Sequence, residues 1–358
     1  MSGQPLLLGI ETSCDDTAAA VVDGRGAVLA SVVASQLAHR PYGGVVPEIA
    51  SREHLRNWPA VLAETLSRAG LTLAQVSAVA ATRGPGLVGS LLVGLSLGKA
   101  MAFALSRPFF AVHHLEGHLY SPFLETQGAL AREIPESFVG LVVSGGHTAL
   151  YGVSSGPVET LAETRDDAIG EAFDKIGKRV GLAYPQGPRV DELAERGDPE
   201  RYALPLPGNT DQALDFSYSG LKSQALLEVE RLERQGVASD LGAALAAGEE
   251  PPQAVIDLLS SFRAAAVKQV TSRLSSLRRR KLRFATLAVS GGVAANRLLR
   301  RELESWASGH DVELHLVPLA YCGDNAAMIA HAALLRLRRG EGGDPFDLDA
   351  FSRGPIGP

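Results

Sequence analysis

The sequence predicts an α/β protein built from two related domains, and three observations support this prediction. The chain has 358 residues, which is more than one hydrophobic core usually supports. A pattern of three short apolar strands separated by tight turns occurs twice, first from Leu6 and again from Phe138. Segments with helical periodicity follow each copy. A repeated unit of this kind predicts two similar domains that face each other across a cleft.

The first copy begins close to the N-terminus. Its apolar runs predict strands over residues 6–11, 18–22 and 27–33. A helix is expected over residues 51–69, because Leu55, Trp58, Leu62 and Leu66 recur at helical spacing. The apolar segment from Gly86 approaches the length of a membrane span, but Lys99 and several glycines interrupt it. We therefore expect a buried core helix and no membrane association.

The second copy opens the other half of the chain. Strands are predicted within residues 138–164, and helices over residues 166–182, 187–197, 221–235 and 254–277. Residues 236–253 are rich in Ala, Gly and Glu and predict a surface loop, and the tail from Gly340 is expected to be loosely ordered. The expected domains are residues 1–132 with 325–358, and residues 133–324 with a helical insertion.

Net charge and cysteine content bear on the partners, the disulfides and the cellular location to be expected. The formal net charge of −6 gives no sign of a nucleic-acid binder by itself. Only two cysteines occur, Cys14 and Cys322, so we expect no disulfide framework and a reducing, cytoplasmic location. The N-terminal residues carry no positively charged region and only a short apolar stretch, so we expect no signal peptide.

Three turns have the character of phosphate-binding loops. The segments ETSCDDT, SGGHT and SGGVAAN each follow an apolar strand and combine small side chains with polar ones. Glycine lets the backbone approach an anion, and successive N–H groups can surround phosphate oxygens. The third turn also opens a helix, whose N-terminus favours negative charge. Each turn alone is a weak signal, but the three together indicate an anionic ligand.

The segment HHLEGH suggests a metal site. His114 and His118 are four residues apart, so a helix would place both imidazoles on one face, as in zinc enzymes. The alternative is a pair of half-buried polar residues at a domain boundary. The spacing alone leaves both interpretations open.

The motifs taken in order resemble one family. GIETSCDDTAAAVV, VPEIASREHL, RGPGLVGSLLVG, HHLEGH, LVVSGGHT, DDAIGEAFDKIGKRVGL, DFSYSGLKS, VSGGVAANR and CGDNAAMIA are similar to segments of the TsaD family of tRNA threonylcarbamoyladenosine transferases. The resemblance covers roughly residues 7–331. It implies the actin-like/sugar-kinase/Hsp70 fold, with two ribonuclease-H-like lobes around a cleft. Gln186, Gly323 and Ala326 depart from the family's usual residues and leave the local loop geometry open.

The resemblance also implies the ligands and their residues. One divalent metal, Fe²⁺ or Zn²⁺, would be held by His114, His118 and Asp324. Taken alone, Asp324 could be a helix N-cap, and it could serve as both cap and ligand. The substrate would be the adenylate threonylcarbamoyl-AMP, whose threonylcarbamoyl group passes to the N6 amine of the adenosine 3′ of the anticodon. The residues implied to bind this substrate are Val142, Val143, Ser144, Gly145, Gly146, Asp174, Gly187, Asp191 and Asn296.

A carboxylate is expected to orient the attacking amine. We expect Glu11 to orient the amine, with Asp15 and Asp16 as competitors, and we leave His147 unassigned.

The implied partners are tRNA, a TsaB-like paralogue and a TsaE-like P-loop ATPase. The paralogue is expected to contact the helix over residues 51–69 and the helix after Gly86. Between Phe262 and Arg301 the chain carries eleven Lys or Arg and no Asp or Glu, which predicts a surface for the tRNA backbone.

Other functions fit the sequence less well. A metallopeptidase of the HExxH type needs Glu directly after the first histidine, but here Leu115 follows His114 and Glu116 would point away from the shared face. An ATP-driven switch or kinase of the actin-like fold would not need the histidine pair. A scaffold without activity would not explain the three turns.

Overall fold

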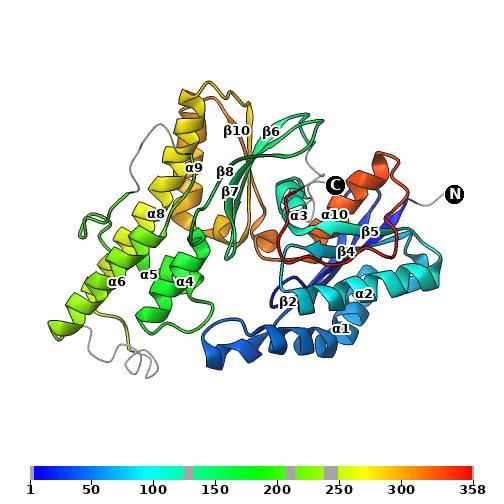
Figure 1. Ribbon diagram of the computed structural model, residues 1–358, viewed down its shortest axis with the longest axis horizontal. Helices are drawn as coiled ribbons and strands as arrows, with labels where there is room; N and C mark the ends of the chain where they lie inside the picture. The colour runs from blue at the N-terminus through cyan, green and yellow to red at the C-terminus, as the bar shows by residue number, and fades with distance from the viewer. Residues whose placement is uncertain (1–3, 125–132, 207–213, 238–248, 357–358) are drawn as a thin grey trace. The chain divides into compact units, whose positions relative to one another are not determined.

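The computed structural model describes residues 4–124, 133–206, 214–237 and 249–356. The chain divides into two compact units (Figure 1). Unit 1 comprises Met1–Pro135 and Val317–Pro358, and unit 2 comprises Glu136–Leu316. The expected division, residues 1–132 with 325–358 and residues 133–324, differs at its last boundary. There the structure assigns Asp324 to unit 1 and not to unit 2.

Unit 1 is a five-stranded mixed sheet with the order β3-β2-β1-β4-β5. The strands are β1 (Leu6–Glu11), β2 (Asp16–Asp23), β3 (Val28–Ser35), β4 (Ala78–Gly84) and β5 (Phe109–His113). The first three form an antiparallel meander, and β4 and β5 continue the sheet parallel to β1. The expected turn at residues 12–17 is shorter than predicted, because Asp16 already pairs with Ser35 in the sheet.

Helices cover both faces of this sheet. Alternate strand residues such as Leu8 and Ile10 pack against α1 (Pro47–Ala69) and α2 (Val88–Leu105). The neighbouring residues, such as Leu7, pack on the other face against α10 (Ala326–Arg338). The alternation is that of a strand whose two faces are both buried. The short helix α3 (His114–Tyr120) follows β5 directly.

Unit 2 repeats the same sheet. Its strands are β6 (Phe138–Val143), β7 (Thr148–Val153), β8 (Glu159–Glu163), β9 (Thr286–Ser290) and β10 (Glu313–Leu316). The order β10-β9-β6-β7-β8 is that of unit 1 with each strand replaced by its counterpart. The predicted duplication is therefore present in strand order and direction. The helices are α4 (Ile169–Arg179), α5 (Gln186–Ala194), α6 (Ser219–Arg234), α8 (Gln253–Arg279) and α9 (Arg297–Ser308).

Short 3₁₀ helices complete the described elements: Leu37–Tyr42, Leu73–Gln75, Ser121–Phe123, Gly292–Ala295 and Leu319–Tyr321. Most of the loop predicted over residues 236–253 lies outside the described residues, since 238–248 are not among them.

The helix after Gly86 is less buried than predicted. Within the described chain, α2 is the one helix whose length and apolar composition would allow it to cross a membrane, and a third of that window is buried. Its inner face packs on the sheet, and a Cβ at Gly98 would lie 3.0 Å from the Ala81 side chain. Its outer face exposes Val88, Leu92 and Phe103. The prediction of a buried core helix is therefore correct for one face only.

The C-terminal tail is held firmly, contrary to the prediction from its composition. Arg336 of α10 binds both carboxylate oxygens of Asp344 at 2.8 and 2.9 Å. Asp344 also accepts a hydrogen bond from the backbone N–H of Ala111 in β5, at 2.7 Å. Further along, the N–H of Phe351 donates to the carbonyl of Arg83 at 3.2 Å. A tail rich in glycine and aspartate predicts a loosely ordered chain end, but in this protein specific polar contacts hold the tail in place.

Candidate metal centre and phosphate-binding loops

The three histidines of HHLEGH have different roles because α3 begins between them. His113 ends β5 and caps the helix: its Nδ1 accepts a hydrogen bond from the N–H of Leu115 at 3.3 Å. Its Nε2 lies 3.4 Å from the carbonyl of Gly354, and since Nδ1 accepts, the ring proton is on Nε2. Burial lowers the pKa of His113 to about 4. His113 is thus a neutral capping residue.

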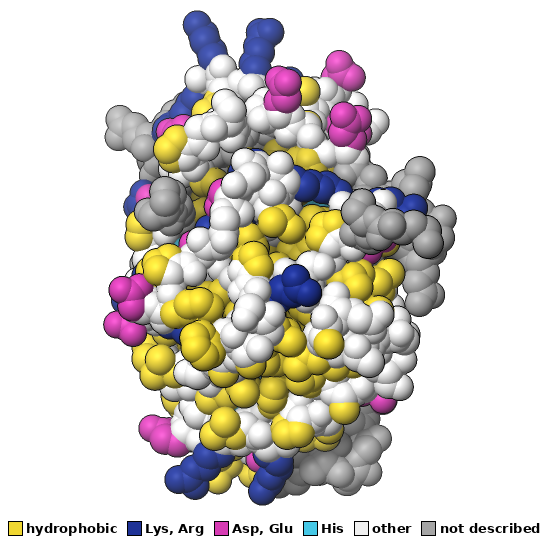
Figure 2. Space-filling model, turned by 90° about the vertical axis from the view of Figure 1, so that its right-hand side faces the viewer, with side chains coloured by type: hydrophobic (Ala, Val, Ile, Leu, Met, Phe, Trp, Pro, Cys, Tyr) yellow, Lys and Arg dark blue, Asp and Glu magenta, His cyan; other side chains and the backbone are white. Residues whose placement is uncertain are grey.

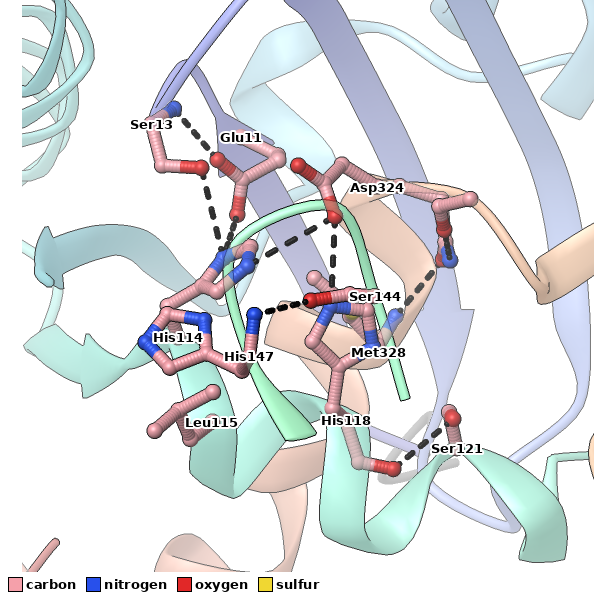
Figure 3. A network of polar contacts seen from close by, with 12 residues as sticks. Glu11, Ser13, His114, Leu115, His118, Ser121, Ser144, His147, Asp324 and Met328 are labelled. Carbon is pink, nitrogen blue, oxygen red and sulfur yellow. Dashed lines mark hydrogen bonds and ion pairs between the residues drawn. The ribbon is translucent and has the colours of Figure 1, made fainter. Parts of the chain in front are cut away.

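His114 and His118 lie on one face of α3 together with Asp324. The Nε2 of His118 is 3.1 Å, and the Nε2 of His114 is 3.5 Å, from Oδ1 of Asp324. All three potential ligand atoms lie within 4.8 Å of one another. The two imidazole rings are perpendicular, with centroids 4.7 Å apart. Figure 3 shows the two rings and the carboxylate pointing toward one another.

This donor set fits a divalent transition metal. Zn²⁺ or Fe²⁺ binds imidazole nitrogen and carboxylate oxygen at about 2 Å, which places such ligands about 3 to 3.5 Å apart. Both rings are buried, whereas the Asp324 side chain is 26% exposed, so the cluster is open to solvent on the aspartate side. Three protein ligands would leave coordination positions for a substrate oxygen.

Glycine brings α10, and with it Asp324, close enough to the histidines. A Cβ at Gly117 of α3 would lie 3.0 Å from the Ile329 side chain, so α3 packs tightly on α10. A Cβ at Gly9 of β1 would lie 2.2 Å from the carbonyl oxygen of Ala326 in the first turn of α10. The cap of α10 is Asn325, whose Oδ1 accepts from the N–H of Met328 at 3.0 Å. The helix-capping alternative for Asp324 is therefore wrong, and its carboxylate faces the histidines.

Glu11 lies behind His114 and is fully buried. Its Oε2 is 3.1 Å from Nδ1 of His114 and accepts a hydrogen bond from the Thr82 hydroxyl at 2.6 Å. Its Oε1 accepts from the N–H of Ser13 at 2.5 Å (Figure 3). Both oxygens are used within unit 1. We expected Glu11 to contact the attacking amine, but neither of its carboxylate oxygens is exposed.

Neighbouring charges shift the pKa values of His114 and Glu11 in opposite directions. Burial alone would lower the pKa of His114, but the carboxylates of Asp324 and Glu11 outweigh it and raise the pKa to about 9. Burial alone would raise the pKa of Glu11, but the adjacent His114 outweighs it and holds that pKa below its ordinary value. Glu11 is therefore an anion and accepts from all its partners. A metal ion bound here would take the place of a proton on Nε2 of His114.

The two competing aspartates have different surroundings. Asp16 accepts a hydrogen bond from the Ser35 hydroxyl at 2.5 Å, and burial raises its pKa to about 7. Asp15 is partly exposed in the turn between β1 and β2. Thr82 and Ser13, which support Glu11, were not predicted from the sequence. Their positions at a strand end and in the ETSCDDT turn are the only signal that could have identified them.

In unit 2 the loop after β6 is open to a ligand. The N–H of Ser144 donates to the carbonyl of His147 at 2.8 Å, and the N–H of His147 donates to the Ser144 hydroxyl at 3.1 Å. Between them, a Cβ at Gly145 or Gly146 would meet nothing within 4 Å. The tight turn therefore presents bare backbone, as the glycine pattern predicted.

Val142 and Val143 do not contribute side chains to this loop. Both are fully buried in β6. Their carbonyl and N–H groups pair with β7 and β9, and the carbonyl oxygen of Val143 would lie 2.3 Å from a Cβ at Gly291. Because strand β6 is covered on both faces, these two side chains are not open to a ligand. That Val142 and Val143 line the phosphate side of the substrate stays a prediction.

Asp174 and Gly187, both expected to bind the substrate, lie next to each other. The Oδ1 of Asp174 accepts from the N–H groups of Gly187 at 2.9 Å and Gln186 at 3.2 Å, at the start of α5. Gln186, one of the departures from the family pattern, is buried.

Asp191 and Asn296 have structural partners. The Oδ1 of Asp191 binds Arg263 at 2.8 Å, its Oδ2 accepts from the N–H of Arg297 at 3.2 Å, and it is 9% exposed. Asn296 caps α9 by accepting from the N–H of Leu299 at 2.9 Å. Asp191 thus ties the α9 start to α5 and α8.

The basic block over residues 262–301 is not a single surface. Arg263 and Arg273 are buried, and Arg301 forms an ion pair with Glu195 at 3.1 Å. The exposed members at the end of α8 and beyond it are Arg279, Arg280, Lys281 and Arg283. Helix packing turns every third or fourth residue inward, so the number of basic residues overestimates the exposed charge.

The alternative peptidase site is not formed. Glu116 lies on α3, where the positive charges of Arg336 and Arg339 act on it. Neither it nor any other described glutamate adds to the three-residue metal cluster. The predicted orientation of Glu116 away from the histidines agrees with this environment.

Comparisons with known proteins agree with this picture. The family described as TsaD, tRNA N6-adenosine threonylcarbamoyltransferase, matches residues 27–331. The tRNA N6-adenosine threonylcarbamoyltransferase of Syntrophobacter fumaroxidans is 48% identical over 352 residues, which cover 97% of this chain and 99% of the relative. The protein of the same name from Cyanothece sp. is 46% identical over 354 residues, with 97% and 96% covered.

Solved structures share the fold at low identity. HypF of T. kodakarensis is 14% identical with a TM-score of 0.56, covering 94% of this chain and 48% of that one. Component A of the (R)-2-hydroxyglutaryl-CoA dehydratase of Acidaminococcus fermentans is also 14% identical, with a TM-score of 0.50 and coverages of 94% and 98%. These likenesses, with the repeated sheet order, confirm the expected actin-like fold. By its sequence over nearly its whole length, the chain belongs to the TsaD family, the tRNA N6-adenosine threonylcarbamoyltransferases.

Proposed function

We propose that this protein transfers the threonylcarbamoyl group of threonylcarbamoyl-AMP to the N6 amine of the adenosine 3′ of the anticodon in tRNA. Family membership supports the reaction. The single structural observation that carries the proposal is the cluster of His114, His118 and Asp324, which offers two nitrogens and one oxygen to a metal. Neither a plain nucleotide switch nor a scaffold requires such a cluster.

One Fe²⁺ or Zn²⁺ would be held by these three residues. When bound, it would supply Lewis-acid chemistry by neutralising negative charge on the phosphate of the leaving group. The residues of the chain supply the rest: imidazoles held in place by packing and by Glu11, and an open side at Asp324. The donor set accepts either ion.

The loops of unit 2 are proposed to bind the adenylate. Gly145 and Gly146 offer backbone N–H groups without side chains in the way, which suits a phosphate. Asp174 and Gly187 meet at the start of α5, where a polar ligand would find both backbone and carboxylate. Val142 and Val143 would take part only through the backbone at the end of β6. Asn296 would act from the cap of α9, and Asp191 by supporting that cap.

In the reaction the amine nitrogen attacks the carbonyl carbon of the carbamoyl group, the bond from that carbon to the phosphate oxygen breaks, and AMP leaves with the bonding electrons. The amine loses one proton as the new C–N bond forms. Since Glu11 is fully buried with both oxygens bonded, we assign the orientation of the amine to Asp15 or Asp16. Of these, Asp16 has a pKa of about 7, near the value suited to accepting a proton at neutral pH.

The proposed partners are tRNA, a TsaB-like paralogue and a TsaE-like P-loop ATPase. The exposed apolar side chains of α1 and α2, Leu55, Val88, Leu92 and Phe103, support a protein partner on these helices. The face drawn in Figure 2 carries hydrophobic side chains over its central area, with most charged side chains toward its margins. The basic residues at the end of α8 support contact with the tRNA backbone. We propose a cytoplasmic location.

The test is the mass spectrometry of nucleosides from tRNA after depletion of this protein in its host. The expected result is loss of threonylcarbamoyladenosine, with recovery when the wild-type chain is supplied and no recovery with His114→Ala. An unchanged level of the modified nucleoside in depleted cells would contradict the proposed function. A variant that fails to recover must also be shown to fold, by its cooperative thermal unfolding.

A further inference from the structure

We infer that Glu11 is a positioning residue of the metal site: with Thr82 and Ser13 it holds the His114 ring so that Nδ1 carries a proton and the Nε2 lone pair faces the metal. The inference rests on the proposed metal site and not on the proposed transfer reaction. It assigns Glu11 a different task from the one that its place in the ETSCDDT turn predicted.

The chemistry of the contact defines the histidine tautomer. A carboxylate has no hydrogen to donate, so the 3.1 Å contact between Oε2 of Glu11 and Nδ1 of His114 requires a proton on Nδ1. The Ser13 hydroxyl oxygen lies 3.3 Å from the same nitrogen and can share that proton. With Nδ1 protonated, the neutral ring has its only lone pair on Nε2, the atom that faces Asp324 at 3.5 Å.

Glu11 is itself held rigidly. Thr82, at the end of β4, donates its hydroxyl hydrogen to Oε2, and the backbone N–H of Ser13 donates to Oε1. Glu11 closes strand β1, so its backbone is fixed by pairing with β2. Three donors from three segments of unit 1, the Thr82 hydroxyl, the Ser13 N–H and Nδ1 of His114, therefore surround one buried carboxylate. A carboxylate hydrogen-bonded to a ligating imidazole increases the basicity of that ligand and fixes its orientation.

The second histidine has no such support. The Nδ1 of His118 is buried without a hydrogen-bond partner among the described residues. On its Nε2 side the ring contacts Asp324 at 3.1 Å. Its backbone is held because α3 packs on α10 at Gly117 and because the Ser121 hydroxyl donates to the His118 carbonyl at 2.9 Å. The two metal ligands are therefore unequal, and the loss of Glu11 should act through His114 alone.

The test is metal affinity, measured with Zn²⁺ alone on the full-length protein in competition with a chromophoric chelator. We expect Glu11→Gln to weaken Zn²⁺ binding about 10- to 100-fold, the usual effect of losing a carboxylate behind a ligating histidine. Glu116→Gln is the matched control: it makes the same change two residues from His114 on α3, next to Arg336, and should leave the affinity unchanged. Equal affinities of wild type and a folded Glu11→Gln protein would overturn the inference.

Double variants test whether Glu11 acts on the metal through His114. Glu11→Gln should cost little further affinity in a His114→Ala background and its full 10- to 100-fold in a His118→Ala background. Full losses in both backgrounds would mean that Glu11 acts on the whole site and not through His114. Thr82→Val, which leaves the carboxylate in place, should weaken binding by a smaller factor than Glu11→Gln.

One measurement needs no variant at Glu11. Nitrogen-15 NMR of the Zn²⁺-loaded protein, labelled at histidine and assigned by loss of one signal in His114→Ala, reports which ring nitrogen carries hydrogen. Protonated Nδ1 and metal-bound Nε2 in His114 are expected. Metal-bound Nδ1 would refute the inference even where Glu11→Gln does not fold. If the wild-type chain binds no Zn²⁺ or Fe²⁺, the proposed metal site itself fails, which is a separate outcome.

Discussion

The Nε2 of His118 lies 3.1 Å from Oδ1 of Asp324 although 206 residues separate the two in sequence. Both residues belong to unit 1, because the chain returns to that unit at Val317 after completing unit 2. The return places α10 on the sheet beside α3, and the metal cluster forms at this junction.

Asp324→Ala should abolish tight metal binding. The variant removes the only carboxylate of the three-residue cluster, so we expect Zn²⁺ affinity to fall by at least about 100-fold, more than for loss of a supporting residue. The measurement is chelator competition combined with metal content after purification. Glu304→Ala, at an exposed position of α9, is the control and should match the wild type. Full metal occupancy in Asp324→Ala would remove this residue from the ligand set.

Gly9→Ala should disturb the metal site from the opposite side of α10. The new Cβ would lie 2.2 Å from the Ala326 carbonyl oxygen, a backbone atom that moves only with the helix. Such overpacking costs about 3 kcal/mol of unfolding free energy and displaces the helix that follows Asp324. Urea unfolding measures the first effect and Zn²⁺ affinity the second. Gly152→Ala, where the nearest atom is 3.5 Å away, is the control. Wild-type stability in both variants would contradict the close approach.

Acid should destabilise the protein between about pH 6.5 and pH 4 through His331. Burial lowers the pKa of His331 to about 4, and neither ring nitrogen has a hydrogen-bond partner among the described residues. Since the unfolded state binds the proton first as pH falls, stability declines over this window, by about 3 kcal/mol at most for this group.

His331→Leu removes that group while it keeps the buried volume similar. The slope of the unfolding free energy against pH should become shallower between pH 6.5 and 4, and it should not vanish, because His113 has a similar pKa of about 4. Urea unfolding at several pH values measures the slope. Parallel curves for the two proteins would show that His331 does not contribute.

Lys281 and Arg283 should contribute to tRNA binding. Replacing both with Ala removes two exposed positive charges beyond α8, so affinity should fall and the slope of log affinity against log salt should decrease by about 2. The measurement is tRNA binding at several salt concentrations. Arg234→Ala on α6 is the control for loss of an exposed arginine. An unchanged salt slope would place the tRNA elsewhere.

Leu92→Glu should prevent capture of the proposed paralogue. Leu92 is 45% exposed on the outer face of α2, where a buried carboxylate in an apolar interface would be costly. Leu227→Glu on α6, at a residue that is 53% exposed, introduces the same charge at an exposed leucine of unit 2. The two variants are compared by co-purification with the host's TsaB-like protein. Equal recovery of that protein with both variants would locate its contact away from α2.

Local patterns determined much of what the sequence predicted. The repeated meander, the helices and the histidine pair depend on periods of two and three to four residues, which are visible in any short window. His114 and His118 share a face because they are four apart in a helix, so their pairing could be predicted without the fold. The same holds for the bare backbone at Gly145 and Gly146.

Tertiary structure alone decided what depends on burial and on distant segments. Asp324 joins the histidines because Gly9 and Gly117 admit α10, and the sequence suggested this only through its resemblance to a family. Glu11 supports His114 because the end of β1 is covered, and Arg263 serves the core because α8 turns that side inward. The tail is held because Asp344 meets Arg336 and β5. In each case the role of a residue depends on which polar groups are buried beside one another, because a buried polar group needs a partner. The local sequence does not show which distant groups become neighbours.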